Sequence, residues 1–217
     1  MQESKLLTGS ITKSLLIFAL PMIAGNLLQQ CYNIADTIIV GRFLGADALA
    51  AVGSAYTLMT FLTSIILGLC MGSGASFSIS YGQQDFDRMK SGIFQSFVFI
   101  GAVTVVLNVA VFAGIRGIIW FLRVPGSITG LMEDYLLVIF AGIVGTFLYN
   151  YFACLLRSIG NSRVPLIFLA VSAVMNIVLD LVFVLNFHWG VAGVAIATII
   201  AQFCSWVFGI FYINRVY

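Results

Sequence analysis

The sequence predicts an all-α, polytopic membrane protein with six transmembrane helices. Of its 217 residues, 61% are apolar and only 8% are charged, and the mean hydropathy is +1.10, whereas about half of an average soluble domain is apolar. Charged and turn residues divide the chain into six apolar stretches, each long enough for the roughly 20 residues that a spanning helix needs. The apolar residues are continuous rather than alternating, which argues against strands.

Each element follows from where the charges and turn residues fall. A polar segment, residues 1–13, begins the chain; no small-residue cleavage site ends a short apolar core after it, so we expect the first stretch to be a retained helix. Short polar connections separate the stretches and leave no room for a soluble domain. The predicted helices cover about residues 14–43, 47–82, 91–122, 132–159, 164–185 and 190–213. From the second helix onwards, the connections read GQQDFDRMK, VPGSITG, GNSRVP and FHWG.

The positive charges predict that both termini are cytoplasmic. With an inside N-terminus and six helices, the inner side carries Lys5, Lys13, Arg88, Lys90, Arg157, Arg163 and Arg215. The outer side carries Arg42, Arg116 and Arg123. Because short cytoplasmic loops are enriched in Lys and Arg, we expect a multi-pass protein of the cell inner (cytoplasmic) membrane, with the lipid bilayer as its partner. The net charge of +2 and the lack of a Lys/Arg stripe give no reason to expect a nucleic-acid partner.

Two aspartates lie within the predicted membrane segments, and each follows a proline by fifteen residues. Pro21 precedes Asp36, and Pro165 precedes Asp180. A carboxylate inside a bilayer is costly, so it indicates function by default. A shift of 144 residues aligns the two pairs. Either this match is a coincidence or it marks a parallel internal repeat, of the kind that transporter folds carry.

The sequence predicts a cation site around Asp180. Asn176 lies four residues earlier and therefore on the same helix face. At 1.5 Å per residue, Asp180, Thr198 and Asp36 all lie roughly 10 Å below the outer surface. Carboxylate, amide and hydroxyl oxygens suit a small hard cation such as Na⁺, or a proton, and suit zinc or copper poorly. The alternative is that both acids are structural and bond to neighbouring helices.

Other polar residues within the predicted helices are candidates for a substrate cavity or for interhelical hydrogen bonds. Pro21 removes a backbone hydrogen bond inside the first helix, so it is either a hinge or a fixed kink. Pro165 falls in the first turn of its helix, where proline is tolerated. The candidate cavity residues are Gln29, Tyr32 and Asn33 in the first helix, and Tyr149 and Asn150 in the fourth.

The sequence argues against an enzyme, a cofactor and a disulfide. The motif GASFS contains Ser78, but the chain's one histidine, His188, belongs to a turn predicted on the opposite side of the membrane, so no Ser–His protease is expected. No helix carries the spaced arginines of a voltage sensor, and no pore-loop filter is present. The cysteines form no metal-ligand spacing, and we expect buried free thiols at Cys31, Cys70, Cys154 and Cys204.

With these residues placed, the chain resembles the MATE (multidrug and toxic compound extrusion) transporters, and in particular their DinF/MepA-like bacterial branch. The segments that carry the resemblance are LPMIAGNLLQQCYNIADTIIVGRFLGADALAAVG, LLRSIGNSRVP, MNIVLDLVFV and GVAGVAIATIIAQ. The resemblance implies a twelve-helix, two-lobe transporter of which this chain matches the N-terminal six-helix lobe. It also implies a cation site at Asp36, Asn176, Asp180 and Thr198, with Tyr32 near it, and a bending first helix at Pro21.

We therefore expect the N-lobe of an antiporter that couples Na⁺ or H⁺ entry to the export of amphipathic, often cationic organic compounds, without a cofactor. The partner would be a missing C-terminal lobe or a second copy of this chain, because one bundle cannot provide alternating access by itself. Two alternatives stay open. One is a lipid-linked precursor flippase of the same superfamily, although no intramembrane Arg or Lys cluster is visible. The other is a non-transporting membrane fragment or assembly factor.

Overall fold

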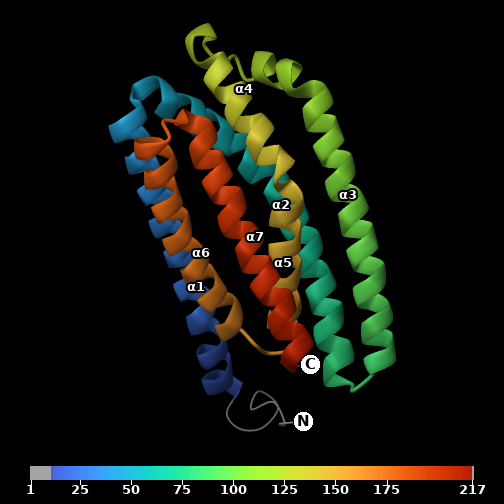
Figure 1. The fold of residues 1–217 in the computed structure, drawn as a ribbon. Helices are drawn as coiled ribbons and strands as arrows, with labels where there is room; N and C mark the ends of the chain where they lie inside the picture. Colours follow the sequence, from blue (N-terminus) through green and yellow to red (C-terminus); the bar gives the residue numbers. More distant parts are fainter. Residues whose placement is uncertain (1–10, 217) are drawn as a thin grey trace.

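The described part of the chain is a bundle of long helices. A computed structural model of the protein describes residues 11–216, and no strand occurs among them. The long helices are connected by short turns and run side by side (Figure 1). The elements are α1 (Ile11–Ile39), η1 (Val40–Leu44), α2 (Ala46–Gly82), α3 (Phe86–Phe121), α4 (Gly126–Ala141), α5 (Ile143–Ser158), α6 (Arg163–Leu181), η2 (Val182–Asn186) and α7 (Gly190–Val216). The elements η1 and η2 are single π-helical turns.

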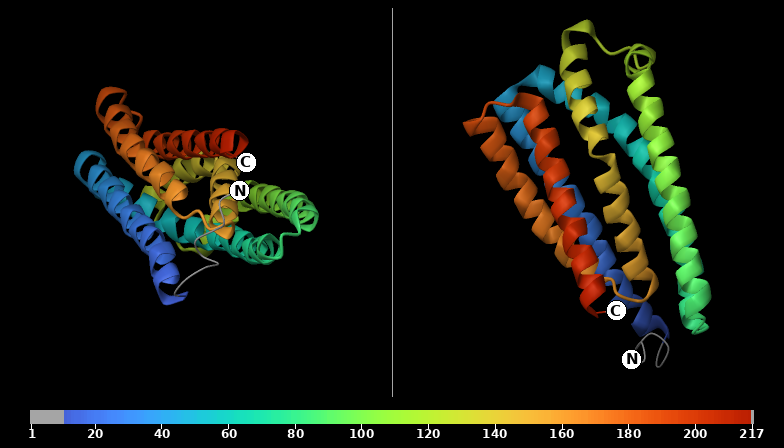
Figure 2. Two further views of the ribbon diagram at one scale, coloured as in Figure 1. Left: turned by 90° about the horizontal axis from the view of Figure 1, so that it is seen from below. Right: turned by 45° about the vertical axis from the view of Figure 1, so that its right-hand side comes forward.

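The order of the helices in space differs from their order in the chain. Helix α1 packs against α6, although most of the bundle separates them in sequence, and α7 lies against both α6 and α5. Helix α3 lies at the other side of the bundle and contacts α2, α4 and α5. Figures 1 and 2 show that α1 begins, and α7 ends, at the same end of the bundle. The packing of α1 on α6 brings the two predicted acidic positions to neighbouring helices.

The all-α membrane fold predicted from the sequence is confirmed. Five helices are long and apolar enough to cross a membrane, and there are up to six if α4 and α5, which bend by 49° at their junction, count as one span. Large apolar side chains are exposed along the outer helix faces; Leu27, Val106 and Phe211, for example, are 64%, 66% and 67% exposed. Such surfaces fit hydrocarbon surroundings rather than water.

Two predicted helix starts are too late in the chain. Helix α3 begins at Phe86 rather than near residue 91, because the Asp85 side chain accepts a hydrogen bond from the Arg88 backbone N–H at 3.0 Å and caps the helix. Helix α4 begins at Gly126 rather than near residue 132. Charged residues before α3 and turn residues before α4 suggested connections, but a helix can extend beyond the apolar region when its free N–H groups are capped or solvated.

The predicted helix 132–159 is two helices that meet at Gly142. The Phe140 carbonyl next to this break accepts a hydrogen bond from Asn108 Nδ2 of α3 at 2.6 Å. Ile199 of α7 packs against Gly142 so closely that a Cβ there would lie 2.3 Å from Ile199 Cγ1. The Gly142 backbone itself is unstrained, with φ −92°, so the requirement for glycine at this position comes from the close approach of α7.

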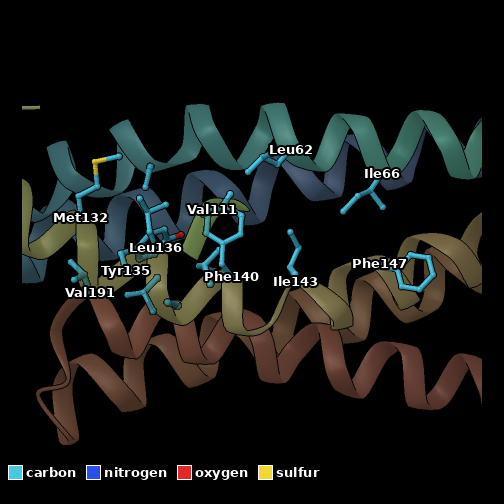
Figure 3. Packing of buried hydrophobic residues seen from close by; sticks show 14 of the residues in the cluster. Leu62, Ile66, Val111, Met132, Tyr135, Leu136, Phe140, Ile143, Phe147 and Val191 are labelled. Carbon is cyan, nitrogen blue, oxygen red and sulfur yellow. The ribbon is translucent and has the colours of Figure 1, made fainter. Parts of the chain in front are cut away.

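Apolar side chains from α2, α4, α5 and α7 fill the middle of the bundle. In Figure 3, Leu62 and Ile66 of α2 face Phe140 and Ile143 across this core. Tyr151 is buried among aromatic rings and donates its hydroxyl to the Ile93 carbonyl at 2.7 Å. The packing is therefore dense on the side of α2 and α3.

All four cysteines are free thiols, but one prediction about them is wrong. Cys70 and Cys154 are buried and Cys204 is half-buried, whereas Cys31 is exposed. Helix α1 lies at the side of the bundle and packs mainly on α6, so only part of its circumference meets other helices. Apolar surroundings in the sequence could not show that Cys31 faces outward.

Candidate functional site

The packing of α1 on α6 places Asp36 and Asp180 together. Asp180 is completely buried, at 0% exposure, and Asp36 is half-buried. The two side chains lie close enough together to interact electrostatically. Two carboxylates at this separation repel each other strongly unless a proton or a bound cation compensates their charge. The pair therefore forms a site that attracts positive charge.

Several buried acceptor oxygens in and beside this pair receive no hydrogen bond from the described residues. Both Asp180 oxygens and Asp36 Oδ1 are buried and have no hydrogen-bond partner in the described part of the chain. Asn176 Oδ1, one helical turn from Asp180, is also buried and unpartnered. Buried polar atoms are almost always paired, so each exception needs a reason such as a functional role or a bound ion. Four acceptors that lack donors near one position indicate a site for a proton or a cation.

Thr198 connects α7 to this group. Asn176 Nδ2 donates to Thr198 Oγ1 at 3.3 Å, and Thr198 Oγ1 donates to the Val194 carbonyl at 3.1 Å. These bonds use the amide N–H of Asn176 and leave its carbonyl oxygen free. The structure thus places the four predicted residues, Asp36, Asn176, Asp180 and Thr198, in one region of the bundle.

Tyr135 of α4 is a neighbour that the sequence did not indicate. Its side chain is 7% exposed, and it lies close enough to Asp36, Asp180 and Tyr32 to interact with them electrostatically. In the sequence, Tyr135 follows two acidic residues near the predicted start of a helix, and no pattern there indicates a site. Helix α4 begins earlier than predicted. Tyr135 therefore lies inside the bundle rather than at the start of the helix, which the sequence could not show.

A cavity of about 760 Å³ extends from this site along the bundle. Asp36, Asn176 and Thr198 line it, whereas Asp180 lies behind them and does not. The five residues predicted for a substrate cavity all line it: Gln29, Tyr32, Asn33, Tyr149 and Asn150. The sequence did not indicate several further polar lining residues, which come from α2, α5, α6 and α7: Tyr56, Thr60, Thr63, Ser64, Thr146, Arg157, Ser172 and Gln202.

Hydrogen bonds hold several polar side chains of the cavity wall in place. Asn150 Nδ2 donates to the Thr146 carbonyl at 2.8 Å, and the Thr146 hydroxyl donates to Gln202 Oε1 of α7. On α1, Asn33 Nδ2 donates to Gln30 Oε1 at 3.2 Å. Amide and hydroxyl groups interleaved with apolar side chains are typical of sites for amphipathic molecules.

The two acid-bearing helices end alike. Helix α1 continues into the π-helical turn η1, and α6 continues into η2, a few residues beyond Asp36 and Asp180 respectively; η1 and η2 touch each other. Single π-helical turns often occur at functional sites. Pro21 lies inside α1, which continues on both sides of it, and Pro165 lies in the first turn of α6. This likeness supports the internal repeat, although the two prolines are not equivalent.

The metal that the site could hold is limited by its ligands. Within residues 11–216, no group of three or more His, Cys, Asp or Glu side chains is placed to bind a metal ion. The candidate site has two carboxylates with one amide and one hydroxyl group. This set suits a monovalent hard cation better than a transition metal.

Fold and site together define a multi-pass helical membrane protein whose bundle carries an open cavity, lined by apolar and polar residues, next to an acid pair, as in secondary transporters. The MatE family model matches residues 21–182, which is most of the chain. The chain belongs to the MatE family. It is therefore part of a transporter family rather than an enzyme family.

The relatives and solved structures agree with this assignment. The chain is 34% identical over 207 residues to "Probable multidrug resistance protein YpnP" of Bacillus subtilis (strain 168), covering 95% of this chain and 46% of the relative. It is 30% identical over 210 residues to "Multidrug export protein MepA" of Staphylococcus saprophyticus, covering 95% and 46%. The fold matches "Crystal structure of MATE in the bent conformation" with a TM-score of 0.92 at 24% identity, covering 100% of this chain and 49% of that one. The chain thus spans about half the length of the proteins it matches.

Proposed function

We propose that this chain is the N-terminal lobe of a secondary antiporter that couples Na⁺ or H⁺ entry to the export of amphipathic organic compounds. The observation that supports it best is the group of four buried acceptor oxygens at Asp36, Asn176 and Asp180, which have no donors in residues 11–216. A proton or a small cation would supply the missing positive charge. The names of the MepA and YpnP relatives, which refer to multidrug export and resistance, support the substrate class.

The proposed ligands would hold Na⁺ and a proton in different ways. A proton on either carboxyl group would let Asp36 and Asp180 share a hydrogen bond, because the two side chains interact at close range. Sodium would take oxygens from both carboxylates together with Asn176 Oδ1, while Thr198 holds the Asn176 amide in place. Both cations bind the same oxygens and would compete, and competition of this kind allows either to drive transport.

Coupling requires that the cation bind one conformation better than another. Asp36 is carried by α1, whereas Asp180 and Asn176 are carried by α6. Cation binding would hold α1 against α6, and cation release would let the repelling carboxylates separate. Pro21 interrupts the backbone hydrogen bonds of α1, and it would be the hinge about which the helix bends.

The remainder of the transporter would be a second six-helix bundle. The relatives are about twice as long as this chain, and alternating access needs two bundles that move against each other. The second bundle would be a C-terminal lobe or a second copy of this chain. The flippase and assembly-factor alternatives have less support, because the buried acid pair has no role in either.

Sodium or protons should stabilise the purified chain against thermal unfolding. A ligand that binds only the folded state adds about 2.7 kcal/mol at a hundred times its Kd, which for a chain of this size corresponds to a shift of about 5 °C or more. The measurement is the unfolding midpoint in detergent, in NaCl against KCl at constant ionic strength, and at several pH values. In Asp180→Asn the dependence should disappear.

The matched control for this experiment is Asp47→Asn. Asp47 is an exposed acid in the first turn of α2, and its replacement should leave the cation dependence intact. A wild-type midpoint that responds to neither sodium nor pH would sink the proposed cation site.

Pro21→Ala should uncouple α1 bending from cation binding. Alanine restores the backbone N–H that proline lacks and removes the ring clash with the preceding turn, so α1 should stiffen. Spin labels at the exposed positions Leu16 of α1 and Ile167 of α6 would report the bend in a background without the native cysteines. We expect sodium to change this distance in the parent but not in Pro21→Ala, while the sodium-dependent midpoint shift remains. An equal distance change in both proteins would contradict the hinge.

A further inference from the structure

Arg157 is a basic side chain in the cavity wall. It belongs to the last turn of α5 and is half-buried, and its side chain lines the same cavity as Asp36. Side chains on a helix point toward its N-terminus, which directs the Arg157 guanidinium up the cavity rather than out of the bundle end. The guanidinium accordingly lies close enough to Tyr149, two turns earlier, to interact with it electrostatically.

Arg157 has no partner of opposite charge among the residues that the structure describes. The ion pair observed within residues 11–216 joins Arg116 to Glu133 at 3.5 Å, near the other end of the bundle. Arg157 makes neither a hydrogen bond nor an ion pair with its side chain in the described residues. A guanidinium presents five N–H donors in a planar arrangement that matches carboxylate and phosphate oxygens. Its donors are therefore available to an anionic group within the cavity.

The charges that line the cavity are separated along its length. Among the described lining residues, Asp36 is the single acid and Arg157 the single base. Asp36 lies near the outer end of α1, and Arg157 lies near the inner end of α5, about 20 Å along the helix from Ile143. When protons or cations compensate the charges of both Asp36 and Asp180, the remaining fixed charge on the wall is that of Arg157. The cation-loaded cavity should then favour an anionic group at its inner end.

We propose that Arg157 forms an anion subsite of the cavity, which takes the phosphate or another oxyanion of an amphipathic molecule whose apolar body lies toward Tyr149. This inference deepens the proposed transport function and rests on it for the use of the cavity. The acid pair alone attracts positive charge and would not bind an oxyanion. Tyr149 and Asn150 lie on the same stretch of α5 as Arg157 and offer an aromatic face and an amide to such a ligand.

The test uses 1-naphthyl phosphate with the purified chain in a neutral detergent, compared with 1-naphthol and with inorganic phosphate. We expect 1-naphthyl phosphate to bind at least about tenfold more tightly than either, because hydrogen bonds to charged groups contribute more than neutral ones. Arg157→Gln should remove this advantage, and Arg157→Lys should keep part of it, since lysine retains the charge without the planar donor arrangement. Arg163→Gln is the matched control, because Arg163 is exposed at the same end of the bundle and does not line the cavity.

The outcomes separate this inference from the proposed function. If Arg157→Gln binds 1-naphthyl phosphate as the parent does, or if the phosphate group brings no advantage over 1-naphthol, the anion subsite is wrong, whatever the result of the sodium experiment. Should Arg157→Gln aggregate, phenylglyoxal modification of the unaltered chain, mapped by mass spectrometry, decides instead. 1-Naphthyl phosphate should protect Arg157 and not Arg163, and equal modification of Arg157 with and without the ligand would overturn the proposal.

Discussion

Replacing Asp180 with Asn in a complete transporter that contains this lobe should abolish ion-driven efflux. The exchange keeps the shape of the side chain but removes one of the two charges that would hold the cation. Removing one partner of a buried contact between opposite charges costs about 3 kcal/mol of binding free energy, here that of the cation, and this corresponds to over a hundredfold in affinity. At ordinary ion concentrations the site would then stay empty, and no gradient could be used.

The same exchange should not impair folding. Both Asp180 oxygens are buried without donors, and the Asn side chain adds an NH₂ group that can donate to Asp36. Without sodium, the midpoint of Asp180→Asn should therefore equal or exceed that of the parent. This separates loss of coupling from loss of structure, which transport measurements alone would confuse.

The measurement is efflux of a fluorescent substrate from proteoliposomes under an imposed sodium or proton gradient, with Asp47→Asn as the control. We expect the control to transport like the parent and Asp180→Asn to show only leakage. Gradient-driven efflux by Asp180→Asn at the parental rate would refute the assignment of this residue to the coupling site.

Gly142→Ala should destabilise the chain strongly. The added Cβ would lie 2.3, 2.7 and 2.9 Å from Cγ1, Cδ1 and Cγ2 of Ile199, so either α7 or α5 must move. Ile199 is β-branched and has few alternative rotamers, and overpacking of this kind costs about 1–3 kcal/mol or more. The unfolding midpoint in detergent should therefore fall by roughly 5 °C or more.

A double substitution identifies the cause of this loss. Ile199→Ala removes the atoms that the new Cβ would meet, so Gly142→Ala should cost less in the Ile199→Ala background than in the parent, and the two changes should not be additive. Gly145→Ala is the matched control in the same helix, because its Cβ would meet nothing closer than Trp206 Nε1 at 4.0 Å. Additive effects of Gly142→Ala and Ile199→Ala would show that the contact is not responsible.

The break at Gly142 also shows where sequence reasoning stops. Residues 132–159 form an apolar run in which a glycine is tolerated by a continuous helix, so the pattern favoured one span. The bend becomes visible only when Ile199 of α7 is placed against Gly142 and Asn108 of α3 against the Phe140 carbonyl. Both partners are far away in the sequence, and neither is marked by its local context.

Some residues of the candidate site could be predicted from the sequence, whereas others could not. The spacing of Asn176 and Asp180 places them on one helix face, and an acid within an apolar segment can be recognised from the sequence alone. Tyr135 and Arg157, by contrast, lie near the ends of a predicted helix, where no sequence pattern indicates a role in the site. Their inclusion in the site and the cavity depends on the tilt of α4 and on the direction of a side chain in the last turn of α5.

The amino-acid sequence was sufficient for the fold class and for the prediction of a site around Asp180, because hydrophobic length and helical periodicity are local properties of the chain. The buried oxygens of Asp36, Asn176 and Asp180 that lack donors in the described residues, and the opposite charges in the cavity, became visible only in the packed structure. Helices of similar apolar character can pack in many orders, and small close contacts, such as that of Ile199 on Gly142, select one of them. The chemistry of the site depends on that selection.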